Sequence, residues 1–191
     1  TGAAPISTGI LEFFRTIGVP LLEVYGQTES TGVATAQPVD DVKLGTVGVA
    51  IAGVEVKLGD QNEIIMRGGS MFKGYYKSDA ATASTLKDGW LHTGDVGEWR
   101  NGQLKIVDRL KDIMITAGGK NLSPTEIENT IKASPYIKEC IVIGEARKYV
   151  SALIQIDFDT VAKWAEQQRI AYTTFRSLTE QAQVNELIQA E

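Results

Sequence analysis

The stretch WLHTGDVGEW (90–99), followed by GQLKIVDRL (102–110), decides the fold. Short runs of alternating or continuous apolar residues broken by glycine are typical of strands joined by tight turns. Two earlier stretches, TVGVAIAGVEVKL (46–58) and EIIMRG (63–68), have the same character. The sequence therefore predicts a small, strongly bent sheet or distorted β-barrel over about residues 45–109.

Other elements flank this sheet on its N-terminal side and interrupt it once. ILEFFRTI (10–17) has helical spacing of apolar residues and meets a plausible stop at Gly18. LLEVY (21–25) predicts a short strand that leads into a polar loop framed by glycines. DAATASTL (79–86), which begins with a capping residue and is rich in alanine, predicts one short helix.

The composition changes near residue 110. Of the 19 glycines, 18 lie within residues 1–119, and residues 145–191 contain none. Ser123 and Pro124 predict a helix start, with Glu126 completing a capping box. The expected order is a strand at 112–116, a tight turn at 117–121, a helix to about 133, strands at 139–144 and 151–157, and a helical tail from about 159. We therefore predict an α+β chain with two domains, residues 1–109 and 110–191.

Composition excludes several classes of protein. With 19 Lys and Arg against 24 Asp and Glu, a general nucleic-acid coat is not expected. His92 is the only histidine, which excludes chemistry that relies on paired histidines. Cys140 is the only cysteine and is expected to be a buried strand residue, in keeping with a reducing, cytoplasmic compartment. No apolar run approaches the roughly 20 residues of a membrane span, although peripheral membrane contact stays open, as does the oligomeric state.

Three polar clusters could carry chemistry. Thr28-Glu29 places a hydroxyl beside a carboxylate, which suits phosphate and Mg²⁺ but also fits a plain surface loop. Thr93-Gly94-Asp95 offers a carboxylate that could accept hydrogen bonds from ribose hydroxyls, although Gly-Asp is common in turns. The charged run 108–112 lies at the composition change, where a solvated linker is the simpler interpretation. His92 either contacts the nucleotide region or packs in support of the Asp95 loop, and we favour support.

Together these residues resemble the adenylate-forming superfamily, which includes acyl-CoA synthetases, luciferases and peptide-synthetase adenylation domains. Five motifs match in order over about 130 residues. They are TGAAP (1–5), YGQTE (25–29), GWLHTGD (89–95), VDRLKD (107–112) and GGKNLSPTEIE (118–128).

The resemblance implies roles for individual residues. It implies that Gly2, Ala3 and Ala4 lie beside adenine, that Tyr25 stacks on it, and that Gly26 and Gln27 belong to the same nucleotide site. Thr28 would bind the phosphate that becomes AMP and Glu29 would hold Mg²⁺, both as catalytic residues. Asp95 and Arg109 would bind the ribose. On the CoA side, the resemblance implies a turn of Gly118, Gly119 and Lys120, with Lys111 as the hinge.

The subfamily resembles long- or medium-chain fatty-acyl-CoA synthetases, because Ala117-Gly118-Gly119-Lys120-Asn121 is followed by Ser123-Pro124. The resemblance implies a parent protein that uses ATP, Mg²⁺ and CoA to convert a fatty acid to an acyl-AMP and then to a thioester. A fatty-acyl-AMP ligase that loads a carrier protein, and a non-catalytic acyl- or nucleotide-binding protein of the same fold, remain alternatives.

Two departures from the family pattern bear on activity. The serine-, threonine- and glycine-rich phosphate loop and the C-terminal catalytic lysine are not found in these 191 residues, where the last lysine is Lys163. We therefore expect the 191 residues alone, as a piece of a longer protein, to have no ligase activity. The family's Gly-Glu-Ile phrase appears as Asn62-Glu63-Ile64, a change that turn-tolerant asparagine can accommodate.

Overall fold

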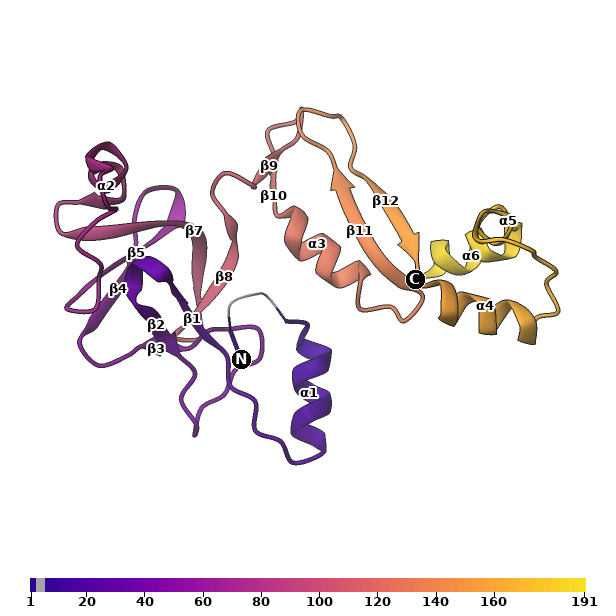
Figure 1. Cartoon of the computed structure of the whole chain (residues 1–191), viewed down its shortest axis with the longest axis horizontal. Helices are drawn as coiled ribbons and strands as arrows, with labels where there is room; N and C mark the ends of the chain where they lie inside the picture. The colour runs from indigo at the N-terminus through magenta and orange to yellow at the C-terminus, as the bar shows by residue number, and fades with distance from the viewer. Residues whose placement is uncertain (3–5) are drawn as a thin grey trace. The chain divides into compact units, whose positions relative to one another are not determined.

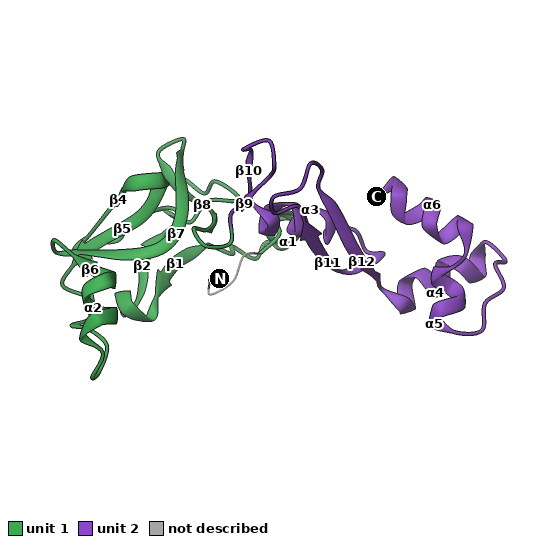
Figure 2. Cartoon of the chain, turned by 90° about the horizontal axis from the view of Figure 1, so that it is seen from above, with its two compact units in different colours: residues 1–112 green, residues 113–191 purple. Residues whose placement is uncertain are grey.

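The structure, a computed structural model, describes residues 1–2 and 6–191 of the chain. It forms two compact units, Thr1–Asp112 and Ile113–Glu191, which are shown in separate colours in Figure 2. The division lies between Asp112 and Ile113, close to the composition change in the sequence. Each unit is described on its own below.

Unit 1 consists of two curled antiparallel sheets with short helices around them (Figure 1). The first sheet has the order β1-β2-β3, and the second has β4-β5-β7-β6 with β8 paired to β7. The strands are β1 (Val24–Gln27), β2 (Gly32–Ala36), β3 (Val49–Ala50), β4 (Val54–Leu58), β5 (Glu63–Gly68), β6 (Leu86–Lys87), β7 (Trp90–Arg100) and β8 (Gln103–Arg109). The helices are α1 (Thr8–Thr16), η1 (Thr28–Ser30), η2 (Asp60–Asn62) and α2 (Asp79–Thr85).

The curl of the second sheet depends on small residues and irregular register. The pairing of β7 shifts between Glu63 and Ile65 on one side and between Val96 and Gly97 on the other. A Cβ atom at Gly97 would lie 2.8 Å from the Ile64 side chain, so the strands approach closely there. Two hydrogen bonds of 2.7 Å between residues 47–48 and Leu104 link β8 to the segment directly before β3.

One apolar core lies between these sheets. Its fully buried members come from both of them: Ile64, Met66, Leu91, Leu104 and Ala34. At about 25 cal/mol per Å², burial of such side chains is the main favourable contribution to folding. The bent, glycine-broken sheet expected from the sequence is confirmed.

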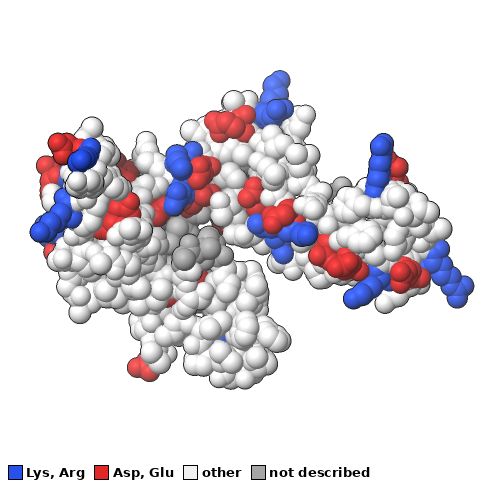
Figure 3. Space-filling model, viewed as in Figure 1, with Lys and Arg blue, Asp and Glu red and all other residues white. Residues whose placement is uncertain are grey.

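Helix α1 lies at the edge of unit 1, and few of its side chains are buried. The Ser7 hydroxyl accepts a hydrogen bond from the Ile10 N–H, and Leu11 is the helix's buried residue. Ile10, Phe13 and Ile17 are exposed, and Figure 3 shows few charged side chains around this helix. The helix and its stop at Gly18, with φ of 84°, agree with the sequence.

Unit 2 opens with a two-stranded hairpin and continues as a helix on a second hairpin. The elements are β9 (Met114–Ile115), β10 (Asn121–Leu122), α3 (Pro124–Ile131), β11 (Ile137–Ile143), β12 (Ser151–Ile156), α4 (Phe158–Gln167), α5 (Phe175–Thr179) and α6 (Ala182–Ala190). The Ser123 hydroxyl accepts from the Glu126 N–H at 3.0 Å, which confirms Ser123 as the N-cap of α3.

Two small cores hold unit 2 together. Ile127 and Ile131 of α3 pack on Met114, Cys140 and Val142, which confirms Cys140 as a buried strand residue. Burial raises the pKa of its thiol. The three C-terminal helices share the second core, formed by Ile156, Val161, Ala162, Ala165, Leu178 and Val184. In the described part of the chain, no helix has both the length and the apolar character to cross a bilayer.

Two expected strands are shorter than the sequence indicated. The first begins at Val24 rather than Leu21, because its partner β2 ends at Ala36. The Glu23 N–H instead donates to the Gln37 side chain at 2.8 Å. The strand expected at 112–116 is only Met114–Ile115, since the Asp112 N–H turns back to the Arg109 carbonyl.

Gly48 gives a direct test of the close approach between β2 and the chain before β3. Its φ is 78°, and an added Cβ would lie 1.9 Å from the Ala36 carbonyl oxygen. Gly53, with φ of 83° and open space around it, is the matched control. We expect Gly53→Ala to lower the free energy of unfolding by about 1 kcal/mol and Gly48→Ala by more than about 3 kcal/mol. Urea unfolding measures both, and equal losses would contradict the packing described here.

Candidate functional site

The centre of the site is the carboxylate of Asp95, which β7 carries into a buried position. Asp95 is 7% exposed. Its Oδ2 accepts hydrogen bonds from the Tyr25 hydroxyl at 2.6 Å and from Gln27 Nε2 at 2.9 Å. Two residues of β1 therefore hold a carboxylate that lies about 70 positions later in the chain, which brings the YGQTE and HTGD motifs together.

Asp95 keeps acceptor capacity on its second oxygen. Across the β7–β8 ladder it pairs with Arg109, and Arg109 Nε lies 3.5 Å from Asp95 Oδ1. The Arg109 side chain is 62% exposed, so most of it faces solvent. An ionised carboxylate offers about four lone-pair sites, and the hydrogen bonds from Tyr25 and Gln27 both go to Oδ2, so Oδ1 keeps acceptor capacity beside Arg109. This oxygen could accept hydrogen bonds from a pair of vicinal hydroxyls.

Tyr25 takes part in the site through its hydroxyl. The residue is only 8% exposed and belongs to the core of unit 1. Burial is the main cause that raises its pKa, and the charge of Asp95 and the hydrogen bond to it raise it further. The expected stacking on adenine stays a prediction, while the contact observed here is the one with Asp95.

The turn after β1 is held in one shape by its backbone and by Ser30. A Cβ at Gly26 would lie 1.6 Å from the Gly32 carbonyl oxygen, so only glycine fits. The buried Ser30 hydroxyl accepts from the Gln27 N–H at 2.9 Å and lies 2.8 Å from the Gly32 carbonyl oxygen. This fixed turn leaves the Thr28 side chain exposed at its start.

Glu29, next along the turn, is tied to the loop that follows β5. Its Oε1 accepts from the Tyr75 hydroxyl at 2.6 Å, and its carbonyl accepts from the Phe72 N–H at 2.7 Å. The hydrogen bond to Glu29 is the main cause that raises the pKa of Tyr75, followed by burial. The sequence analysis gave Tyr75 no role, because a side-chain contact spanning 46 positions leaves no local pattern.

The one carboxylate of Glu29 is compatible with a Mg²⁺ ion that is bound together with the phosphates of a nucleotide. Within residues 1–2 and 6–191, no group of three or more His, Cys, Asp or Glu side chains could hold a metal by itself. Mg²⁺ commonly keeps several waters and binds one or two carboxylates together with substrate phosphates. Glu29 fits that pattern of ligands.

His92 contacts Glu63, which in turn binds the loop before Asp95, and the supporting role that the sequence analysis favoured stays a prediction. Its Nδ1 lies 2.7 Å from Glu63 Oε2, and Glu63 Oε1 accepts from the Gly94 N–H at 2.9 Å. Glu63 was missed as a site residue. The only sequence signal was its place in the Asn62-Glu63-Ile64 phrase.

The residues expected on the CoA side form a tight turn in unit 2. Gly118, Gly119 and Lys120 join β9 to β10, and the Gly119 N–H donates to the Thr116 carbonyl at 2.8 Å. Gly119 has φ of 77°, a conformation that favours glycine. Lys111, the expected hinge, is exposed in the turn that ends unit 1.

The N-terminal motif is only partly described. Gly2 lies beside β1, where an added Cβ would come within 2.9 Å of the Val24 side chain. Ala3 and Ala4 lie outside the described residues.

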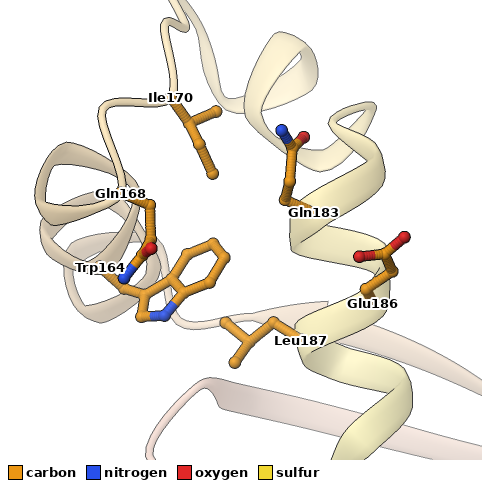
Figure 4. A pocket seen from close by; sticks show the side chains of 6 residues that line it. All are labelled: Trp164, Gln168, Ile170, Gln183, Glu186 and Leu187. Carbon is orange, nitrogen blue, oxygen red and sulfur yellow. The ribbon is translucent and has the colours of Figure 1, made fainter.

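A hollow of about 500 Å³ in unit 2 is a separate feature. Figure 4 shows the six side chains that line it: Trp164, Gln168, Ile170, Gln183, Glu186 and Leu187. None of the residues singled out from the sequence lines this hollow, so the nucleotide site is not assigned to it.

Family models match both units of the chain. Residues 1–76 match the family described as AMP-binding enzyme, and residues 111–186 match the AMP-binding enzyme C-terminal domain. The chain belongs to the AMP-binding enzymes. This confirms the family that the five sequence motifs indicated.

Relatives of this AMP-binding enzyme carry names of fatty-acid ligases. It is 42% identical over 180 residues to long-chain-fatty-acid–CoA ligase 5 of Mus musculus, covering 86% of this chain and 26% of that protein. It is 36% identical over 167 residues to long-chain-fatty-acid–CoA ligase FadD15 of Mycobacterium bovis, covering 87% and 28%. The fadD11 protein of Mycobacterium tuberculosis is 44% identical over 171 residues, with 88% and 30% covered. The chain thus spans less than a third of the length of the curated relatives that it matches.

Solved structures of adenylate-forming enzymes share the fold. O-succinylbenzoate coenzyme A synthetase from Bacillus subtilis with ATP and magnesium ion aligns with a TM-score of 0.73 at 29% identity, covering 82% of this chain and 36% of that one. MatB from Rhodopseudomonas palustris aligns with a TM-score of 0.65 at 33% identity, covering 82% and 35%. The α+β class, with the distorted sheet that ends an adenylation domain, is confirmed.

The raised pKa of Tyr25 predicts a loss of stability in alkali. An unfolded tyrosine ionises near pH 10, whereas folded Tyr25 keeps its proton to higher pH. Its contribution to stability is therefore complete below about pH 10 and is lost as the pH rises toward the folded pKa, by at most about 1.4 kcal/mol per pH unit. Tyr25→Phe should reduce this slope in urea unfolding between pH 9 and 11. The exposed Tyr76 gives the control Tyr76→Phe. If stability falls with pH equally steeply in the two variants, the assignment of the alkaline loss to Tyr25 is contradicted.

Proposed function

We propose that this chain is part of a fatty-acyl-CoA synthetase that binds ATP on unit 1. The proposal rests on the buried Asp95 carboxylate, which is held by Tyr25 and Gln27 through Oδ2 and keeps acceptor capacity on Oδ1, beside Arg109. A carboxylate in this setting suits the ribose hydroxyls of a nucleotide. The fatty-acid–CoA ligase names of the relatives support an acyl substrate.

In this proposal, different residues around Asp95 bind the ribose and the phosphate of the nucleotide. Asp95 accepts from the ribose hydroxyls, and the exposed guanidinium of Arg109 reaches the same sugar. The exposed hydroxyl of Thr28 donates to the phosphate that becomes AMP. Because Gly26 and Ser30 fix the turn, Thr28 would need little reorganisation to do so.

Glu29 would hold Mg²⁺ together with the phosphates of ATP. The bound Mg²⁺ would neutralise charge that develops on the leaving pyrophosphate. The Tyr75 hydroxyl occupies one oxygen of Glu29 and leaves the other for the cation or one of its waters. Within the part of the chain that the structure describes, Glu29 is the carboxylate that we assign to this role.

The first half-reaction would join the fatty-acid carboxylate to the α-phosphorus of ATP and release pyrophosphate. In the second, the thiol of CoA would attack the acyl carbonyl and AMP would leave. Gly118, Gly119 and Lys120 would contribute to the second step through a turn whose glycines let a narrow ligand approach the backbone. Lys111, at the end of unit 1, would be the hinge between the two steps.

A fatty-acyl-AMP ligase that passes the acyl group to a carrier protein is the second candidate. It shares the first half-reaction, so the residues around Asp95 do not distinguish it. The names of the relatives favour CoA as the acceptor. A cytoplasmic location, expected from the single cysteine, stays a prediction.

The direct test is pyrophosphate release by the full-length protein over a panel of fatty acids, with and without CoA. We expect ATP- and Mg²⁺-dependent release with long-chain acids, and AMP and acyl-CoA when CoA is added. Acyl-AMP that accumulates and is unchanged by CoA would favour the carrier-loading ligase. No release with any acid would contradict the proposal.

Asp95→Ala tests the nucleotide site in the full-length protein. Losing hydrogen bonds to a charged group should cost about 2–4 kcal/mol, which lowers kcat/KM for ATP by tens to hundreds of fold. Glu98→Ala, an exposed carboxylate on the same strand, is the control. Steady-state kinetics with ATP and a melting curve give the two readouts. An ATP dependence like that of the control would remove Asp95 from the site.

Lys111→Pro tests the hinge. Among the described residues, the Lys111 N–H donates no backbone hydrogen bond, so proline removes no such bond while it fixes φ near −65°. It also restricts Leu110 before it. If the rotation is blocked, single-turnover assays should show acyl-AMP formation within about threefold of wild type and CoA transfer reduced about a hundredfold. The control Lys111→Ala should retain both steps. Equal losses in both steps for Lys111→Pro would contradict the assignment of Lys111 as the hinge.

A further inference from the structure

Glu63 lies at the start of β5 and pairs with Val96 of β7, next to the register shift between these two strands. Its side chain is only 14% exposed and that of His92 is 26% exposed. One carboxylate oxygen lies 2.7 Å from His92 Nδ1, and the other accepts from the Gly94 N–H at 2.9 Å. Both oxygens are therefore committed to the loop that precedes Asp95.

Gly94 connects the contact with Glu63 to the candidate site around Asp95. Its φ is 71°, so its N–H leaves the regular ladder of β7 and needs another acceptor. Glu63 supplies that acceptor, and the Gly94 carbonyl in turn accepts from the Leu110 N–H at 2.8 Å. Gly94 is thus held on both sides, and the next residue is Asp95.

Neighbouring bonds fix the same loop from other directions. The Thr93 hydroxyl donates to the Ile64 carbonyl at 2.6 Å and accepts from the Asp95 N–H at 3.1 Å. The Thr93 carbonyl accepts from Gln27 Nε2 at 2.9 Å. None of these neighbouring bonds supplies an acceptor for the Gly94 N–H, which donates to Glu63. If its carboxylate is removed, a partly buried N–H loses its partner and the bulge can relax.

We propose that Glu63 is a positioning residue for Asp95, acting through the Gly94 N–H, with His92 fixing the orientation of the Glu63 carboxylate. The inference rests on the proposed nucleotide site. Glu63 touches no part of the ribose, so its loss should displace the Asp95 carboxylate without removing it. A displacement of about 1 Å is enough to weaken a positioned contact strongly.

The test compares Glu63→Ala, Glu63→Gln and Glu55→Ala in the full-length protein. Glu55 lies on the adjacent strand β4 and pairs with Arg67 at 2.6 Å, but its side chain is 62% exposed. We expect Glu63→Ala to raise KM for ATP about tenfold with kcat within about twofold of wild type. Glutamine keeps an acceptor oxygen for Gly94, so Glu63→Gln should recover most of the loss. Glu55→Ala should match wild type.

A second readout does not depend on catalysis. Hydrogen exchange followed by mass spectrometry should show faster exchange in peptides covering residues 91–97 and 108–112 for Glu63→Ala, and much less for Glu63→Gln. Peptides of β4 should be unchanged. This local pattern separates loss of positioning from general destabilisation, which would speed exchange throughout unit 1.

The outcomes are distinguishable. Glu63 variants that match Glu55→Ala in both KM and local exchange would overturn the inference. A rise in KM with no rescue by glutamine, or exchange that is faster throughout unit 1, would also overturn it, because either outcome indicates a general structural role. If wild-type protein uses no ATP, the proposed function fails, and the exchange pattern alone then decides whether Glu63 holds the Asp95 loop.

Discussion

A carboxylate that is removed from water must find donors within the protein, and Asp95 meets this requirement with side chains from a distant strand. The Tyr25 hydroxyl and Gln27 Nε2 supply hydrogen bonds of 2.6 and 2.9 Å. Without them, a buried carboxylate would cost several kcal/mol. The position of β1 against β7 and the site therefore depend on the same few bonds.

This requirement also explains the glycines and bulges of unit 1. For β7 to bring Asp95 to β1 and also pair with β5 and β8, its register must shift twice. Gly94 adopts a positive φ at the first irregularity, and Gly97 lets Ile64 approach at the second. A regular, flat strand would point Asp95 elsewhere, so the distorted sheet is part of the site.

The sequence predicted the parts of the site that lie within ordered motifs. Tyr25, Gln27, Asp95 and Arg109 were named from them, and the structure brings all four together. Glu63 and Tyr75 were missed, because their contacts to Gly94 and Glu29 span 31 and 46 positions and depend on the bulge and the loop conformation. Strand ends were also misplaced where a partner strand stops first, as at Val24. Local pattern identifies elements and motif residues, whereas side-chain contacts across the sheet depend on register.

The central claim is that Asp95 binds the ribose hydroxyls of a nucleotide, and deleting both partners in turn tests it most directly. Isothermal titration calorimetry would measure the binding of ATP and of 2′,3′-dideoxy-ATP to full-length wild-type protein and to Asp95→Ala, which closes a cycle between carboxylate and hydroxyls. The account predicts that wild type binds ATP at least about tenfold more tightly than the dideoxy analogue. It also predicts that Asp95→Ala binds the two with nearly equal affinity. A preference for ATP that survives unchanged in Asp95→Ala would contradict it.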